Sequence, residues 1–318
     1  MTHLYWTMLT LWLLHMPTFG QLSPNTLLRD ALVQENSGSF EAAAKLAKAA
    51  IDSRQLSQNE LGRGYIILAV ACRGAGHLAN AQTAFEHALQ ALEPDREHTE
   101  DYASALENYA GFYTELGQLD VAAPMWRRAY HKRKAIGDHE GTAISLMRLA
   151  EFALSQNRVR EARRYLQKAS NEAKASSGLI ADESAFFFET QGWLAIAEHD
   201  APLAIESYQH ALELVEQSRG EQHWLAGWDH MLLGKAYAES GDCKSAFANM
   251  QTGLTILDRA LGRKNPRYFA AELAYSRALD QFGLHAEAAP MRAAAEKASK
   301  EYYGRQWARC TINAASFR

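Results

Sequence analysis

The 318-residue sequence contains few of the residues that break helices or cross-link a chain. It has only 7 prolines and 20 glycines, which disfavours a turn-rich all-β fold. Its 3 cysteines, Cys72, Cys243 and Cys310, have no C-x-x-C spacing, so a disulfide framework is excluded. An excess of positive charge is also absent, because the formal net charge is −4. No overall basic field therefore attracts nucleic acid or anionic lipid.

Motifs of common catalytic and metal-binding sites are missing as well. The sequence has no phosphate-binding loop, no G-x-S-x-G, no H-E-x-x-H and no paired Cys or His at metal-ligand spacing. Its 12 histidines are scattered. His223 and His230 could share a helix face, but we interpret them as surface or packing residues rather than ligands. The sequence therefore predicts a protein that is not an enzyme, with no cofactor and no metal.

The first residues differ in composition from the rest of the chain. Residues 1–20, MTHLYWTMLTLWLLHMPTFG, contain no Asp, Glu, Lys or Arg and include an apolar run from Leu9 to Leu14. Pro17 and Gly20 then precede Gln21, a layout typical of a secretory signal. The apolar run is shorter than the ~20 residues that span a bilayer. We expect a signal peptide at 1–20 and an exported protein, periplasmic or secreted; a retained segment is the alternative.

The sequence does contain an internal repeat. GQLDVAAPMW at 117–126 returns as GLHAEAAPMR at 283–292, and the chain between them carries the same pattern with a period of about 42 residues. Each unit begins with a small anchor residue, and a hydrophobic residue follows two positions later. An alanine comes three positions after the hydrophobic residue, a bulky residue four positions after the alanine, and a small residue three positions after the bulky one. The seven units start at the anchor residues Gly38, Gly76, Gly117, Asn157, His199, Gly241 and Gly283.

This pattern describes a hairpin of two helices. Spacings of three and four residues place the alanines and the bulky residue on one helix face, and the anchor lies where the preceding helix ends. Alanine lets two helices cross closely while the bulky residue fills the gap beside it. Cys72 and Cys243 occupy inward positions in units too far apart for a disulfide and are predicted to be small core residues.

The units resemble tetratricopeptide repeats, with the best match to the family's L-G-x-x-Y at Leu233, Gly234 and Tyr237. The long period and the Ala-Ala-Pro-Met stretches are similar to the kinesin-light-chain type of this repeat. Leu261-Gly262 followed by Pro266 is similar to the connector of that type.

The resemblance covers residues 24–302 and implies the architecture. We expect an all-α fold, a right-handed superhelical solenoid of about seven tetratricopeptide-like helix hairpins, followed by a capping helix or tail at 303–318. Pro124 and Pro290 are expected early in a second helix, where the N–H that proline lacks is not yet needed.

A superhelix of helix pairs offers a concave groove lined by the first helix of each pair. Asn108 stands where the family often has a groove asparagine, whose amide can pair with a peptide backbone. Phe186, Trp193 and Trp228 are aromatic candidates to anchor a partner. A solvated amide and tryptophans that fill gaps between repeats are the alternatives. The candidate partner-binding residues are Asn108, Glu115, Arg148, Glu151, Phe186, Trp193, Trp228, Lys235 and Arg277.

Two basic stretches, RRAYHKRK at 127–134 and RVREARRYLQK at 158–168, lie on second helices, which face the convex side. A solvated face is the main interpretation, and a weak contact with an anionic surface through 127–168 is the alternative. Nucleic acid is not an expected partner because few aromatic side chains are interleaved with these charges.

The sequence therefore predicts a non-catalytic scaffold that binds a protein or peptide partner in its concave groove. Two alternatives stay open. One is a self-assembling structural protein in which residues 299–318 form a dimer contact, and the other is a peptide-sensing regulator if the N-terminal segment is retained. The sequence does not define an oligomeric state.

Overall fold

The computed structural model describes residues 22–93, 100–176 and 178–306. The regular structure of these ranges consists of fourteen helices and no strand. The expected signal peptide at 1–20 lies outside the described residues, as do Trp307 and Cys310 of the C-terminal segment. In the described part of the chain, no helix is both long and apolar enough to cross a membrane.

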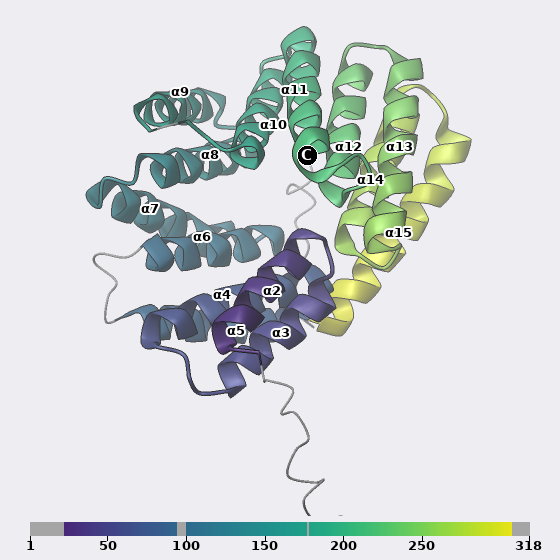
Figure 1. Ribbon diagram of the computed structural model, residues 1–318. Coiled ribbons are helices and arrows are strands. Elements are labelled where there is room, and N and C mark those ends of the chain that lie inside the picture. The colour runs from purple at the N-terminus through teal and green to yellow at the C-terminus, as the bar shows by residue number, and fades with distance from the viewer. Residues whose placement is uncertain (1–21, 94–99, 177, 307–318) are drawn as a thin grey trace, which may run out of the picture.

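The helices form seven consecutive hairpins arranged as a superhelix (Figure 1). This all-α solenoid confirms the fold class and the number of units that the repeat predicts. The hairpins are α2 (Pro24–Asn36) with α3 (Phe40–Asp52), α4 (Gln58–Ala75) with α5 (Leu78–Leu92), α6 (Glu100–Glu115) with α7 (Leu119–Ala135), α8 (His139–Ser155) with α9 (Val159–Ala175), α10 (Ala181–Ala197) with α11 (Ala201–Arg219), α12 (Trp224–Glu239) with α13 (Cys243–Leu261), and α14 (Pro266–Gln281) with α15 (His285–Gln306).

Every anchor residue of the repeat has a left-handed backbone at the turn inside its hairpin. This conformation lets the chain leave the first helix and start the second almost at once. Glycine adopts it without steric cost, whereas Asn157 and His199 carry a Cβ. The φ angles are 81° at Gly38, 88° at Gly76, 72° at Gly117, 57° at Asn157, 61° at His199, 83° at Gly241 and 78° at Gly283.

Alanines fill the crossing points of the hairpins, as the repeat predicts. The bulky residue four positions later is buried beside each alanine in the five hairpins from the second to the sixth: Phe85, Trp126, Leu166, Tyr208 and Met250. The alanines at this position are at most 1% exposed: Ala43, Ala81, Ala122, Ala162, Ala204, Ala246 and Ala288. Close approach of the two helices therefore fixes the packing of each unit.

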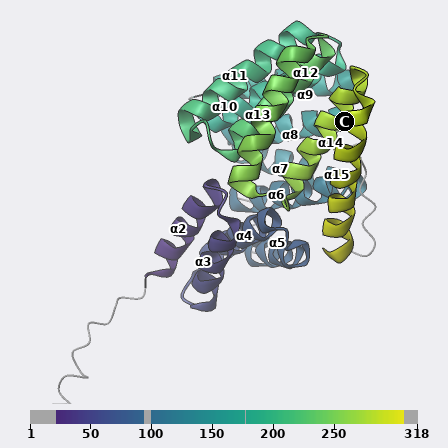
Figure 2. The same ribbon diagram turned by 90° about the vertical axis from the view of Figure 1, so that its right-hand side faces the viewer.

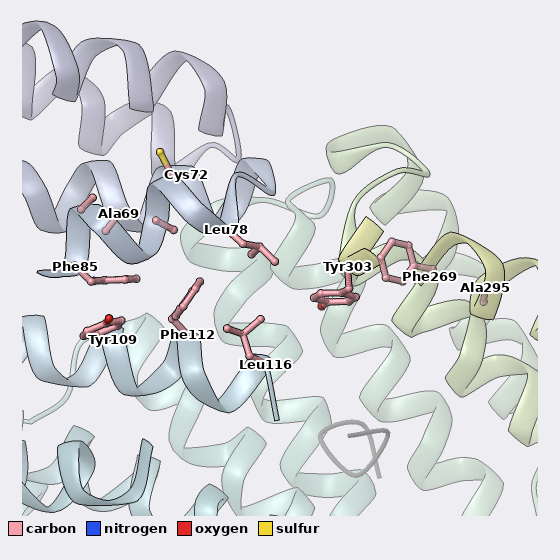
Figure 3. Close-up of a cluster of buried hydrophobic side chains, with 12 residues drawn as sticks. Ala69, Cys72, Leu78, Phe85, Tyr109, Phe112, Leu116, Phe269, Ala295 and Tyr303 are labelled. Atoms are coloured by element: carbon pink, nitrogen blue, oxygen red, sulfur yellow. The ribbon is translucent and has the colours of Figure 1, made fainter. Parts of the chain in front are cut away.

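The superhelix also closes on itself, which the repeat does not predict. Figures 1 and 2 show the array curling round until α14 and α15 return to α4 and α5. In Figure 3, Phe269 and Tyr303 lie in one buried cluster with Leu78 and Leu116. The seam between the ends is also polar, because the Asn265 amide donates a 3.3 Å hydrogen bond to the carbonyl oxygen of Gly74.

Three sequence-based expectations are wrong in detail. The first two concern the burial of Cys243 and the position of two prolines in their helices. Cys72 is buried, but Cys243 is exposed because it is the first residue of α13, before the helix turns inward. Both are free thiols. Pro124 and Pro290 lie inside α7 and α15, beyond the first turn. Each therefore removes one intrahelical hydrogen bond.

The third correction is Arg133, which is not part of a solvated basic face. It lies four residues after Ala129 on the inward face of α7 and is 8% exposed. Its Nη2 and Nε bond to the two carboxylate oxygens of Glu107 at 2.9 and 3.1 Å, and its Nη1 bonds to Asp138 at 2.6 Å. The Ser145 hydroxyl also donates to Glu107. This buried network joins α6, α7 and α8.

Replacing His199 with glycine should stabilise the fold, because a glycine adopts a φ of 61° without the steric penalty of a side chain. We expect a gain of about 1 kcal/mol, read as a higher urea midpoint. The matched control is Gly241→Ala at the same repeat position, which should lower the midpoint. Nothing crowds residue 241, so that loss would come from the backbone alone. An unchanged midpoint for His199→Gly would contradict this account.

Replacing Arg133 with alanine should destabilise the protein strongly, because it leaves the Glu107 carboxylate buried and unpaired. We expect a loss of about 3 kcal/mol or more in the free energy of unfolding, measured by urea denaturation. Arg127→Ala, an exposed position on the same helix, is the control and should change stability by less than about 0.5 kcal/mol. Equal effects of the two variants would show that the network contributes little.

Candidate functional site

The closed array surrounds a cavity of about 570 Å³. The first helices α6, α8, α10 and α12 supply much of its wall, and α4, α14 and α15 complete it where the two ends of the chain meet. First helices line this cavity, as the sequence predicts for a concave groove, and ring closure adds residues of α4, α14 and α15 to its wall.

Most of the candidate partner-binding residues lie on this cavity. The two that do not line it are Lys235 and Arg277, because only the first halves of α12 and α14 reach the cavity. Arg277 is exposed, while Lys235 is half-buried and burial lowers its pKa. A binding role for any of the candidates stays a prediction. The seven that line the cavity are Asn108, Glu115, Arg148, Glu151, Phe186, Trp193 and Trp228.

Sequence reasoning missed several cavity residues. Glu189 lies four residues before Trp193, one turn away on the same helix face, so the repeat register contained the signal for it. Trp224 lies four residues before Trp228 on α12, so the repeat register contained the same signal for it. The others line the cavity where the two ends of the array meet, and they are Arg73 of α4, Arg267 of α14 and Tyr302 of α15.

Carboxyl groups from three successive first helices form an acidic wall, which consists of Glu151 and Glu189, both half-buried and lining the cavity, and Asp229, which is buried and does not line it. Asp229 is 0% exposed, and it interacts electrostatically with the neighbouring Glu189 carboxyl. Among the described residues, the cation paired with this wall is Arg148, whose Nη1 lies 3.0 Å from Glu151 Oε2. Its guanidinium also stacks 3.9 Å from the centre of the Phe186 ring.

The pKa values of the acidic wall are displaced by this environment. Burial, followed by repulsion from Glu151, raises the pKa of Glu189 to about 7. Burial and then repulsion from Glu189 raise the pKa of Asp229 well above its usual range. Burial also raises the pKa of Glu151, although Arg148 acts against it. Near neutral pH a part of the Glu189 population therefore holds a proton, whereas ordinary carboxyl groups are ionised, and the pKa of Asp229 is displaced in the same direction.

No group of three or more His, Cys, Asp or Glu side chains in residues 22–93, 100–176 and 178–306 is arranged to hold a metal ion. Aromatic and polar side chains make up the lining of the cavity.

Comparison with known proteins supports the repeat assignment. The profile of the tetratricopeptide repeat family matches residues 101–173, which run from α6 through most of α9. No curated protein matches the sequence. The described architecture is thus an array of tetratricopeptide-type hairpins, while the kinesin-light-chain repeat type stays a prediction.

Three solved structures share the fold at low sequence identity. A Rap protein complexed with Competence and Sporulation Factor is 13% identical with a TM-score of 0.64, over 89% of this chain and 78% of that one. The apo form of RapI is 14% identical with a TM-score of 0.50, over 89% and 79%. The APC/C hetero-tetramer Cut9-Hcn1 is 15% identical with a TM-score of 0.53, over 87% and 55%. At these identities the likeness establishes the fold alone.

The acidic wall should make the fold less stable as the pH rises. The pKa of Glu189 is about 7 in the folded chain against 4.5 when unperturbed. Between these values the folded chain holds a proton that the unfolded chain has released, so the free energy of unfolding falls with pH. Each such proton contributes about 1.4 kcal/mol per pH unit. We expect a lower Tm at pH 7 than at pH 5.

Glu189→Gln should reduce this loss of Tm between pH 5 and pH 7, because the glutamine does not ionise. Glu213→Gln removes an exposed carboxylate from α11 and should leave the pH dependence as it is in the wild type. A Glu189→Gln protein with the same pH dependence as the wild type would contradict the assignment of a raised pKa.

Proposed function

We propose that the protein is a non-catalytic scaffold that binds a peptide, or an extended segment of a partner protein, in the cavity of the ring. The observation that carries this proposal is the convergence of Asn108, Arg148 and Trp193 from three successive hairpins on one cavity. A volume of about 570 Å³ and a lining of aromatic surface with a few polar groups are features of binding sites.

Asn108 supports this role because, among the described residues, only the Nδ2 atom of its amide is hydrogen-bonded. Its Nδ2 donates a 3.0 Å hydrogen bond to the Ser104 carbonyl oxygen within α6. The Oδ1 atom is left to accept a hydrogen bond from a backbone N–H of a bound segment. The fixed Nδ2 bond also orients the amide before a ligand arrives, which lowers the entropy cost of binding.

Trp193 and Trp228 provide the apolar part of the site. Both are half-buried and line the cavity, on α10 and α12. Aromatic rings of this kind bury a large area with few rotatable bonds, which makes them effective anchors for a partner. Arg148 is held by Glu151 and Phe186, so it presents its charge in a fixed position.

Export of the protein is part of the proposal and is supported by the composition of residues 1–20 alone. Self-assembly through the C-terminal segment is less well supported. Tyr302 and Tyr303 pack against Phe269 of their own chain, with ring centroids 5.7 and 6.5 Å away. These two rings are thereby occupied within the monomer.

Affinity capture from native cell envelope and culture fluid tests the proposed function. The wild type is compared with the triple variant Asn108→Ala, Arg148→Ala, Trp193→Ala, and bound proteins are identified by mass spectrometry. We expect a partner whose capture falls at least tenfold in the triple variant, because each substitution removes a contact of order 1 kcal/mol or more.

The matched control is Asn80→Ala, Arg164→Ala, Gln167→Ala, three exposed positions on the second helices α5 and α9, which should leave capture intact. Circular dichroism melting of both variants shows that the fold is retained. Capture of the same proteins in equal amounts by the wild type and the cavity variant would sink the proposal.

A further inference from the structure

The second helices α7 and α9 carry a group of exposed cations on the side away from the core. Spacings of four and seven residues place the cations of each helix on one side of it. That side is turned away from the buried alanines Ala129 and Ala169. Here we define the basic face as five exposed side chains, none of which lines the cavity: Arg127 and Lys134 of α7, and Arg160, Arg164 and Lys168 of α9.

Packing of α7 against α9 joins the cations of the two helices into one surface. Tyr130 of α7 and Tyr165 of α9 pack against the same hydrophobic cluster, which contains Trp126. Burial raises the pKa of Tyr165, and the charges of Arg127 and Arg164, one from each helix, act against it. Both guanidinium groups therefore lie near the same phenol, at the junction of the two helices.

The cations of the basic face have no counter-ions of their own. Within the described residues none of the five makes an ion pair or a hydrogen bond, although Lys134 Nζ lies 5.9 Å from the centroid of the Tyr130 ring. Other exposed arginines of the chain are paired. Arg63 lies 2.6 Å from a carboxylate oxygen of Asp101, and Arg163, beside the basic face, lies 2.6 Å from one of Glu198.

Few carboxylates are available to neutralise this surface. The sequences of α7 and α9 contain only Asp120, Glu161 and Glu172. Glu161 is paired with Arg158 at 3.6 Å, and Glu172 with His139 at 2.7 Å. Asp120 lies in the first turn of α7, two turns before the first cation of the face. Positive charge is therefore concentrated here, in a chain whose formal net charge is −4.

We propose that the basic face binds the surface of a phospholipid bilayer that contains anionic lipids. Headgroup phosphates form an extended negative layer, which complements cations spread over two helices, and each Lys or Arg near such a layer adds to the attraction. The basic face does not line the cavity, so a chain attached in this way keeps its cavity free for a partner. The inference does not depend on the proposed function.

The composition of the basic face favours a bilayer over a macromolecular partner. Protein interfaces usually have an apolar or aromatic centre, whereas Tyr130 and Tyr165 are half-buried in the hydrophobic cluster. Single-stranded nucleic acid likewise binds through exposed aromatic rings. Among the described residues, the large hydrophobic side chains that are exposed lie outside α7 and α9: Leu22, Leu32, Val33, Ile180 and Leu284.

Sedimentation of the purified full chain with sucrose-loaded vesicles tests this proposal. The probe is phosphatidylcholine with about one third phosphatidylglycerol, and phosphatidylcholine alone is the reference. The ratio of the two affinities is the readout, because apolar contacts contribute to both kinds of vesicle. We expect at least tenfold tighter binding to the anionic vesicles at about 0.1 M salt. This preference should disappear at about 1 M salt, where the screening length falls from about 10 to about 3 Å.

A triple variant locates the preference on the basic face. Arg127→Gln, Arg160→Gln, Arg164→Gln should bring the ratio of affinities close to one, because each cation contributes about fivefold. The matched control is Lys45→Gln, Lys244→Gln, Lys297→Gln, which removes the same net charge from exposed positions on the second helices α3, α13 and α15. The control variant should keep the preference of the wild type. Circular dichroism melting shows that both variants are folded.

Two outcomes of the vesicle assay would overturn the proposal. One is equal binding of the wild type to anionic and neutral vesicles. The other is an equal loss of preference in the two triple variants, since net charge rather than the basic face would then cause the binding.

Polyglutamate and a DNA duplex are titrated in parallel as soluble polyanions. We expect the wild type to prefer anionic vesicles to both. Binding of either polyanion that requires the basic face, without a preference for anionic vesicles, would overturn the bilayer in favour of an acidic protein or a nucleic acid.

This test is separable from that of the proposed function. The cavity variant Asn108→Ala, Arg148→Ala, Trp193→Ala leaves the basic face intact and should bind anionic vesicles as the wild type does. Normal partner capture by a chain that does not distinguish the two kinds of vesicle would refute the bilayer contact alone. Preference for anionic vesicles in a chain whose partner capture does not depend on the cavity would refute the peptide-binding role alone.

Discussion

The turn inside each hairpin is the constraint on which the rest of the structure depends. A single residue with a left-handed backbone ends every first helix and starts the second, and it does so seven times. Because the turn is the same, the hairpins share one shape, and the rotations between stacked hairpins add along a solenoid. After seven hairpins, Phe269 and Tyr303 have come back to Leu78, and the array has become a ring.

Local features of the fold could be predicted from the sequence because their signals are local. The anchors and the buried alanines recur with a fixed spacing, and both lie where the pattern places them. Arg133 shows how a charge pattern can mislead. The run of basic residues in 127–134 indicates a solvated face, but Ala122, Trp126, Ala129 and Arg133 share the inward spacing of four, three and four. The position of Arg133 in the repeat, rather than the basic composition around it, determines its burial. Burial is possible because Glu107 on the neighbouring helix supplies the counter-charge.

Ring closure could not be read from any one repeat. It depends on the sum of small rotations over the array and on aromatic residues that look, in the sequence, like part of a C-terminal cap. Tyr302 and Tyr303 lie in α15, which continues through Gln306, and Tyr303 is 6% exposed. The same long-range origin explains why Arg267 and Tyr302 were missed as cavity residues, whereas Trp193 and Asn108 followed from the register.

The closed ring has a consequence for the rate at which a ligand comes and goes. An open solenoid accepts an extended chain sideways, along its whole length. A closed one admits a chain only end first, or after the contacts of Tyr303, Phe269 and Leu78 have separated. Both routes add a barrier to association and the same barrier to release. A segment bound in the cavity should therefore bind and dissociate more slowly than one bound with the same affinity to an open solenoid. A partner with a free chain end should bind faster than one whose binding segment is an internal loop.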